Sequence, residues 1–181
     1  IRLDTSGDFM RTRQLMRSQG LNTVCEEARC PNIYECWGRQ TATIMILGDV
    51  CTRSCRFCSV KTGKPAVIDF KEALRTAEAV KAMKLRHVVI TSVDRDDLKG
   101  DYGAQAWSDT IKAIRAVTPD CTIEVLTPDF QNYAPAYEKV FQTRPDIFSH
   151  NIECIQRISK KVRPQSDWSR SVSILKASVE W

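Results

Sequence analysis

The sequence has few of the residues and patterns that mark the commoner functional classes. It has only two histidines in 181 residues, His87 and His150, and neither stands in a nucleophile or base motif. It has no run of about 18 consecutive apolar residues, so no segment is predicted to cross a membrane. It has no lysine- or arginine-rich block, and its net charge of +5 comes from 27 basic and 22 acidic residues. Neither a membrane nor nucleic acid is therefore expected as a partner.

Signals for secretion are also missing. The first ten residues contain neither an apolar core nor a small-residue cleavage site, and the chain starts at Ile1 rather than methionine. Eight cysteines in 181 residues are too few for a secreted disulfide scaffold, and their clustering favours metal binding. We expect a cytoplasmic location, or an organelle matrix if a targeting segment precedes Ile1.

Strand-like apolar segments alternate along the chain with amphipathic helical patterns, which predicts parallel β/α units. The helix capped by Asp69 is expected to bury Phe70, Leu74, Ala77 and Val80. The predicted strands are residues 41–47, 87–91, 121–126 and 146–150. The predicted helices are residues 8–18, the segment after Asp69, residues 104–117 and 135–142, and a last helix capped by Ser166 or Asp167.

Four such units do not close a barrel, so the predicted fold class is α/β, a partial (β/α) barrel. Residues 1–40 would form an N-terminal extension, in which Cys25–Cys36 is expected to be an irregular loop. Residues 41–181 would form the incomplete barrel domain.

Polar or thiol-bearing residues follow each predicted strand. In a β/α barrel the loops after the strands open on one face and carry the chemistry. Any one of these loops could be an ordinary turn or helix cap, but four on one face outline a polar pocket. The four segments are Cys51–Cys58, Thr91–Asp97, Thr127–Phe130 and His150–Glu153.

Six of the eight cysteines form two triplets. Cys25, Cys30 and Cys36 are spaced C-x4-C-x5-C, and a second triplet, C-x3-C-x2-C, follows the first predicted strand. Thiolates hold zinc or iron–sulfur clusters. A structural zinc site takes four protein ligands, whereas a four-iron cluster held by three cysteines leaves one iron open to a small molecule. We therefore favour two 4Fe–4S clusters over zinc.

The second triplet carries a specific resemblance. Cys51-Thr-Arg-Ser-Cys55-Arg-Phe57-Cys58 resembles the signature loop of the radical S-adenosylmethionine (SAM) enzymes, including the aromatic residue before the third cysteine. This resemblance implies that the open iron binds SAM and that one-electron reduction yields a 5′-deoxyadenosyl radical. Such a radical takes hydrogen from saturated carbon, which acid–base catalysis cannot activate.

The first triplet resembles one particular family within that group of enzymes. The segment Leu21–Trp37 is similar to the auxiliary-cluster motif of the lipoyl synthase family, and further similarity continues to Arg163. The resemblance implies that Cys25, Cys30 and Cys36 hold a second cluster that gives up sulfur. It also implies an octanoyl substrate on a lipoyl carrier domain, sulfur insertion at C6 and C8, and an electron donor such as ferredoxin or flavodoxin.

The same resemblance suggests which polar residues contact SAM. The backbone of Phe57 would lie near adenine, and Arg163 could pair with the SAM carboxylate. The further candidates are Thr91, Ser92, Asp94, Asn151 and Glu153. His87 is expected to be structural and His150 to shape the pocket, while Glu124 is either a pocket residue or a satisfied core carboxylate. Cys121 and Cys154 match no ligand spacing and are expected to be small core residues.

One departure from the family pattern concerns the ligands of the auxiliary cluster. The family's auxiliary cluster takes a serine from an Arg-Ser-Ser-Tyr motif, which this sequence lacks; Trp168–Ser171 does not match it. The chain would then be either a fragment of a longer protein or a naturally short form with a three-ligand cluster and poor turnover. A truncated or degenerate non-catalytic iron–sulfur protein is the alternative function.

Overall fold

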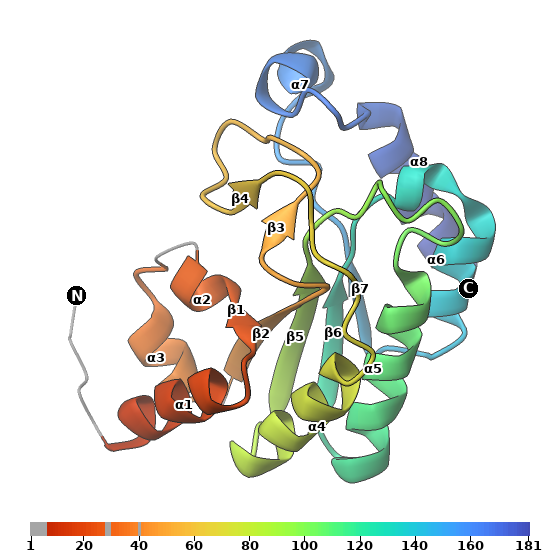
Figure 1. Cartoon of the computed structure of the whole chain (residues 1–181). Helices are drawn as coiled ribbons and strands as arrows, with labels where there is room; N and C mark the ends of the chain where they lie inside the picture. Colours follow the sequence, from red (N-terminus) through yellow and green to blue (C-terminus); the bar gives the residue numbers. More distant parts are fainter. Residues whose placement is uncertain (1–6, 28–29, 40) are drawn as a thin grey trace.

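A computed structural model describes residues 7–27, 30–39 and 41–181. Its main feature is a five-stranded sheet in the order β1-β2-β5-β6-β7, in which β1 is antiparallel and the other neighbours are parallel (Figure 1). A separate pair, β3 and β4, stands above the carboxyl ends of these strands. The strands are β1 (Asn22–Thr23), β2 (Thr41–Ile46), β3 (Val50–Cys51), β4 (Lys61–Thr62), β5 (His87–Ser92), β6 (Thr122–Leu126) and β7 (Ile147–Ser149).

The helices follow the strands in the order expected of β/α units. The α-helices are α1 (Gly7–Ser18), α2 (Val24–Glu27), α3 (Ile33–Gly38), α4 (Glu72–Ala82), α5 (Ala104–Val117), α6 (Ala134–Phe141), α7 (Gln156–Val162) and α8 (Trp168–Val179), and Phe130–Asn132 form one 3-10 turn, η1. Within the described ranges, no helix is long and apolar enough to cross a membrane.

The parallel strands bury one face completely and the other only in part. Ile44 on β2, Ile90 on β5 and Ile123 on β6 are fully buried beneath α4, α5 and α6, which lie side by side across the sheet (Figure 1). The alternating positions, such as Thr43 and Glu124, point to the opposite face and are half-exposed. Because strand side chains alternate between faces, one face builds the core and the other remains free for a site.

Most of the expected elements are present, and the α/β prediction is confirmed. Two expectations about α4 were wrong: Phe70 and Leu74 are 85% and 62% exposed, while Ala77 and Val80 are buried. The helix starts later than expected because Asp69 closes a turn ahead of it, accepting the Lys71 N–H at 2.9 Å.

The prediction of an irregular loop over Cys25–Cys36 was also wrong, because this segment contains parts of α2 and α3. On α3 the buried residues Ile33 and Trp37 lie four positions apart and face the core. The short strands β1, β3 and β4 and the helix α7 were not expected. Each has too few residues to show a hydrophobic period in the sequence.

Candidate functional site

A cavity of about 170 Å³ opens at the carboxyl ends of the parallel strands. Its wall combines thiols, charged groups and apolar side chains that come from the loops after β2, β5, β6 and β7. Its lining residues are Met45, Cys51, Arg53, Cys55, Phe57, Cys58, Val60, Thr91, Ser92, Val93, Asp94, Leu126, Thr127, Pro128, His150, Asn151, Glu153 and Arg163. The three cysteines of the second triplet and all seven candidate SAM contacts therefore share one cavity.

The three thiols of this triplet differ in their surroundings. The Cys51 sulfur accepts backbone N–H groups of Arg53 at 3.4 Å and Asp94 at 3.3 Å. Burial, with a further contribution from the Asp94 carboxylate, raises the pKa of Cys51 to about 11. Burial also raises the pKa of Cys55, against the opposing effect of Arg163. Cys58 is exposed.

The three thiols of the second triplet all line the cavity. Among the residues that the structure describes, no three His, Cys, Asp or Glu side chains converge tightly enough to hold one metal ion. An iron–sulfur cluster is instead held at its corners, by thiols spread around a larger body. The backbone N–H groups aimed at the Cys51 sulfur are of the kind that stabilise a cluster thiolate.

Arg53, between the first two cysteines of the loop, is a buried arginine whose role was not anticipated. Its guanidinium makes a bidentate contact with Asp96, at 2.7 and 2.8 Å, and reaches Asp129 at 2.6 Å and Asp94 at 3.2 Å. Burial opposes its charge, but the contacts with Asp96, Asp94 and Asp129 raise the pKa of Arg53. It also donates to the Ser166 hydroxyl at 3.4 Å. The arginine thus ties the cysteine loop to the loops after β5 and β6 and to the start of α8.

The residues after β5 supply polar groups to the cavity wall. The Thr91 hydroxyl donates to the Leu126 carbonyl at 2.9 Å. The Ser92 hydroxyl is buried and has no hydrogen-bond partner among the described residues. Burial raises the pKa of Asp94 to about 6, although Arg53 opposes that change. A polar ligand in the cavity would satisfy the Ser92 hydroxyl.

The residues after β7 form the opposite wall. Arg163 is buried and donates to the Asn151 carbonyl at 2.7 Å, while its Nε has no hydrogen-bond partner in the described part of the chain. Glu153 has a positive φ of 65° and stands exposed at the cavity mouth. His150 contacts the Thr127 carbonyl at 2.8 Å, and burial lowers its pKa. Its other ring nitrogen lies 2.9 Å from the Ser171 hydroxyl, so both ring nitrogens are held in the cavity wall.

The first triplet lies outside this cavity, with Cys25 on α2, Cys36 on α3 and Cys30 in the segment between them, beside β1 and β2 (Figure 1). Cys25 is buried, and its carbonyl accepts the Cys30 N–H at 3.0 Å. Burial raises the pKa of Cys36, with further contributions from the nearby Cys25 and Cys30 thiols. The three thiols are therefore neighbours in space, although Ala28 and Arg29 between them lie outside the described residues.

Comparisons with known proteins bear on this site. Residues 45–180 match the family model described as "Radical SAM superfamily", and this range includes the second triplet and all four strand-end loops.

The chain belongs to the radical SAM superfamily. Membership implies an iron–sulfur cluster and SAM as cofactors. The chain is 53% identical over 172 residues to a lipoyl synthase of Rubrobacter xylanophilus, covering 95% of this chain and 53% of that protein. It is 50% identical over 180 residues to a lipoyl synthase of Symbiobacterium thermophilum, covering 99% and 56%. A mitochondrial lipoyl synthase of Nematostella vectensis is 45% identical over 176 residues, covering 97% and 60%.

This radical SAM chain spans about half the length of the curated relatives it matches. His87, which was expected to be structural, and Glu124, for which two roles were left open, do not line the cavity. His87 lies 3.3 Å from Glu124, and Glu124 also accepts the Ser149 hydroxyl at 3.0 Å, away from the cavity lining. Glu124 is thus a satisfied carboxylate. Cys121 is buried, whereas Cys154 is only half-buried and was wrongly expected in the core.

Proposed function

We propose that this chain carries the catalytic core of a lipoyl synthase, which inserts two sulfur atoms at C6 and C8 of a protein-bound octanoyl group. The observation that carries the proposal is the identity of about half of all residues with lipoyl synthases, over up to 99% of the chain, which spans both cysteine triplets. In this proposal residues 1–40 carry the auxiliary triplet and residues 41–181 the radical SAM domain, which is supported by the family match that starts at residue 45.

Cys51, Cys55 and Cys58 would hold the cluster that, when bound, supplies the electron for SAM cleavage. The two N–H groups at the Cys51 sulfur would stabilise that ligand as a thiolate. The buried Arg53 network would keep the loop in place while SAM binds and leaves.

The remaining cavity residues would bind and orient SAM. The unpartnered Nε of Arg163 suits its carboxylate, and the unpartnered Ser92 hydroxyl and the Asp94 carboxylate suit donors on the amino group or ribose. Asn151 and Glu153 at the cavity mouth would complete the ribose and amino contacts, and the Phe57 backbone would meet adenine.

Cys25, Cys30 and Cys36 would hold the second cluster and supply the sulfur. Their mutual proximity, seen in the effect of Cys25 and Cys30 on the Cys36 pKa, supports a common ligand. The substrate would be an octanoylated lipoyl carrier domain, and the electron donor a ferredoxin or flavodoxin. We also propose a reducing compartment, the cytoplasm or an organelle matrix, which is supported by eight free cysteines.

The test replaces each triplet separately. Cys51, Cys55 and Cys58 changed together to alanine should remove the bound iron of one cluster and abolish 5′-deoxyadenosine formation on reduction with SAM. If 5′-deoxyadenosine persists, the radical assignment is wrong. Cys25→Ala should preserve SAM cleavage but abolish sulfur insertion, and equal sulfur product from this variant would exclude the donor role. Iron binding without any SAM cleavage in the wild-type chain would favour the non-catalytic alternative.

A further inference from the structure

Four exposed basic residues lie on the segments that carry or adjoin the second cysteine triplet. This basic rim consists of Arg56, Lys64, Arg157 and Lys161, all of them exposed. No ion pair engages any of the four within the described residues, whereas the neighbouring Lys61 pairs with Asp49 at 3.0 Å. Residues 50–68 and 154–165, which carry the rim, contain no aspartate or glutamate. The rim therefore presents uncompensated positive charge to solvent.

The two segments of the rim form one surface. The Arg56 N–H donates to the Val162 carbonyl at 2.9 Å, and the Ser54 N–H donates to the Gln165 side chain at 3.1 Å. These contacts hold the cysteine loop against the carboxyl end of α7, which stands above β3 and β4 in Figure 1. Charges from both segments therefore act together on an approaching molecule.

The same two segments also carry exposed apolar side chains and a proposed cluster ligand. Phe57 and Ile155 are 54% and 56% exposed. Cys58 lies next to Phe57 in the chain and is the one exposed thiol among the eight cysteines, all of which the structure describes. Its side chain also lines the cavity. Exposed apolar side chains next to charged ones are common on protein-binding surfaces.

We propose that the basic rim docks an acidic one-electron carrier protein, with flavin or iron–sulfur as its redox group. This inference rests on the proposed function, because the carrier would be oxidised by one electron while the cluster held by Cys51, Cys55 and Cys58 is reduced by one. The exposed Cys58 favours an electron carrier over the lipoyl carrier domain, since electron transfer requires close approach to a metal ligand. An acyl arm must instead reach the interior of the cavity.

The test reverses two charges of α7 that contact neither the cavity nor any cysteine. In R157E/K161E, the dissociation constant for oxidised flavodoxin, used as the acidic probe, should rise about tenfold at low ionic strength. The difference should shrink when salt reduces the Debye length to about 8 Å or less. Stopped-flow reduction of the cluster by reduced flavodoxin should slow by a similar factor, whereas reduction by methyl viologen, a small cation, should not slow.

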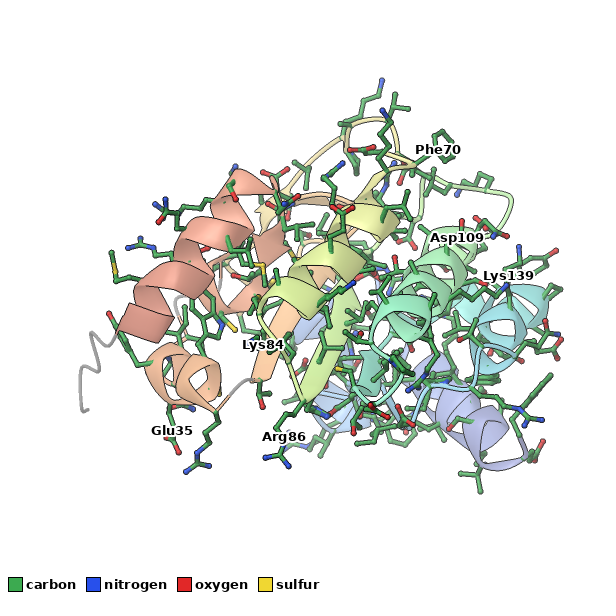
Figure 2. All side chains as sticks on the ribbon, turned by 90° about the horizontal axis from the view of Figure 1, so that it is seen from below. Glu35, Phe70, Lys84, Arg86, Asp109 and Lys139 are labelled. Atoms are coloured by element: carbon green, nitrogen blue, oxygen red, sulfur yellow. The ribbon has the colours of Figure 1, made fainter. Side chains whose placement is uncertain are left out.

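The matched control reverses two charges at the opposite end of the sheet. Lys84 and Arg86 lie at the turn between α4 and β5, at the underside that Figure 2 shows. K84E/R86E should bind flavodoxin as the wild type does. An equal effect of both variants, or no effect of R157E/K161E, would overturn the proposal.

Two further outcomes distinguish this docking proposal from a substrate-docking role and from the lipoyl synthase proposal. If R157E/K161E weakens binding of the octanoylated lipoyl carrier domain but leaves flavodoxin binding unchanged, the rim belongs to the substrate and the proposal is wrong. Flavodoxin binding can be measured on the cluster-free chain. Flavodoxin binding that depends on the rim, combined with no SAM cleavage, would therefore support the docking proposal and reject only the lipoyl synthase proposal.

Discussion

Replacing Arg53 by methionine would remove a buried positive charge that three carboxylates share. The Arg53 side chain is 1% exposed, and Asp129, which it contacts at 2.6 Å, is 0% exposed. Asp94 and Asp96 are 20% and 24% exposed and complete the set. Without the guanidinium, the partners left to the Asp129 carboxylate among the described residues would be Arg170, at 3.5 Å, and the Gln131 N–H, at 3.1 Å.

The expected cost follows from that burial. Removing one partner of a buried ion pair typically costs about 3–5 kcal/mol, because a charge remains in the interior without compensation. Lysine keeps the charge but cannot reproduce the bidentate contact with Asp96 while reaching Asp129. We therefore expect R53K to lose about 1–3 kcal/mol, an amount set by the lost hydrogen bonds.

The assay is anaerobic urea denaturation of the cluster-free chain, together with the iron content after reconstitution. R53M should lower the free energy of unfolding by about 3 kcal/mol or more and should bind less iron, and R53K should recover part of both. R56M is the control, because Arg56 is an exposed arginine of the same loop, and it should stay within about 0.5 kcal/mol of wild type. An R53M chain within about 1 kcal/mol of wild type, with full iron content, would refute the role of the network.

Three other predictions concern the scaffold. D146N should reduce the loss of stability in acid. Burial opposes ionisation of Asp146, but a backbone N–H and Arg115 lower its pKa. The stabilisation by the Asp146 carboxylate is therefore present above the ordinary aspartate pKa of about 4 and is lost as the pH falls. A urea midpoint that falls with decreasing pH as steeply in D146N as in the wild type would contradict that. Ile111 is 1% exposed, so Ile111→Ala should lower the free energy of unfolding by about 2–5 kcal/mol. Leu74 is 62% exposed, so Leu74→Ala should lower it by about 0.5 kcal/mol or less. Similar losses for the two variants in denaturation experiments would show that the helix faces are misassigned. D167A should cost about 1 kcal/mol, because Asp167 caps α8 by accepting two N–H groups, and D167N should recover most of that in thermal melts.

The helical period in the sequence predicted α5 well but misplaced the buried face of α4. Trp107, Ile111 and Ile114 repeat at helical spacing and all pack into the core. In α4 the buried set instead includes Glu72, whose carboxylate accepts the Leu47 N–H at 2.7 Å. A buried carboxylate with a backbone partner 25 residues away leaves no periodic signal, so Phe70 and Leu74 were wrongly expected in its place.

The site, like the helices, could be predicted from the sequence only in part. The C-x3-C-x2-C spacing and the polar residues after each strand are local patterns, and the three cysteines and seven candidate SAM contacts in these loops all line the cavity, whereas Asp96, Asp97 and Asp129 of the same loops do not. The Arg53–Asp129 contact joins residues 76 positions apart, and neither residue stands out in its own segment. An arginine within the cysteine loop and aspartates after β5 and β6 offered the necessary charges, but only the folded sheet brings them together. Both SAM contacts and auxiliary-cluster ligands remain predictions for the loaded protein.

The contacts that hold the cysteine loop have a consequence for the timing of biosynthesis. Ser54 is tied to Gln165 across 111 residues, and Arg53 to Ser166 across 113. At a synthesis rate of about 5–20 residues per second, roughly 6 to 22 seconds separate the loop from its partners on the ribosome. During that interval the thiols of Cys51, Cys55 and Cys58 are made but not yet fixed by residues 165 and 166. A nascent chain therefore has its most oxygen-sensitive interval before the loop is anchored, and iron insertion is expected to follow, not accompany, synthesis of these residues.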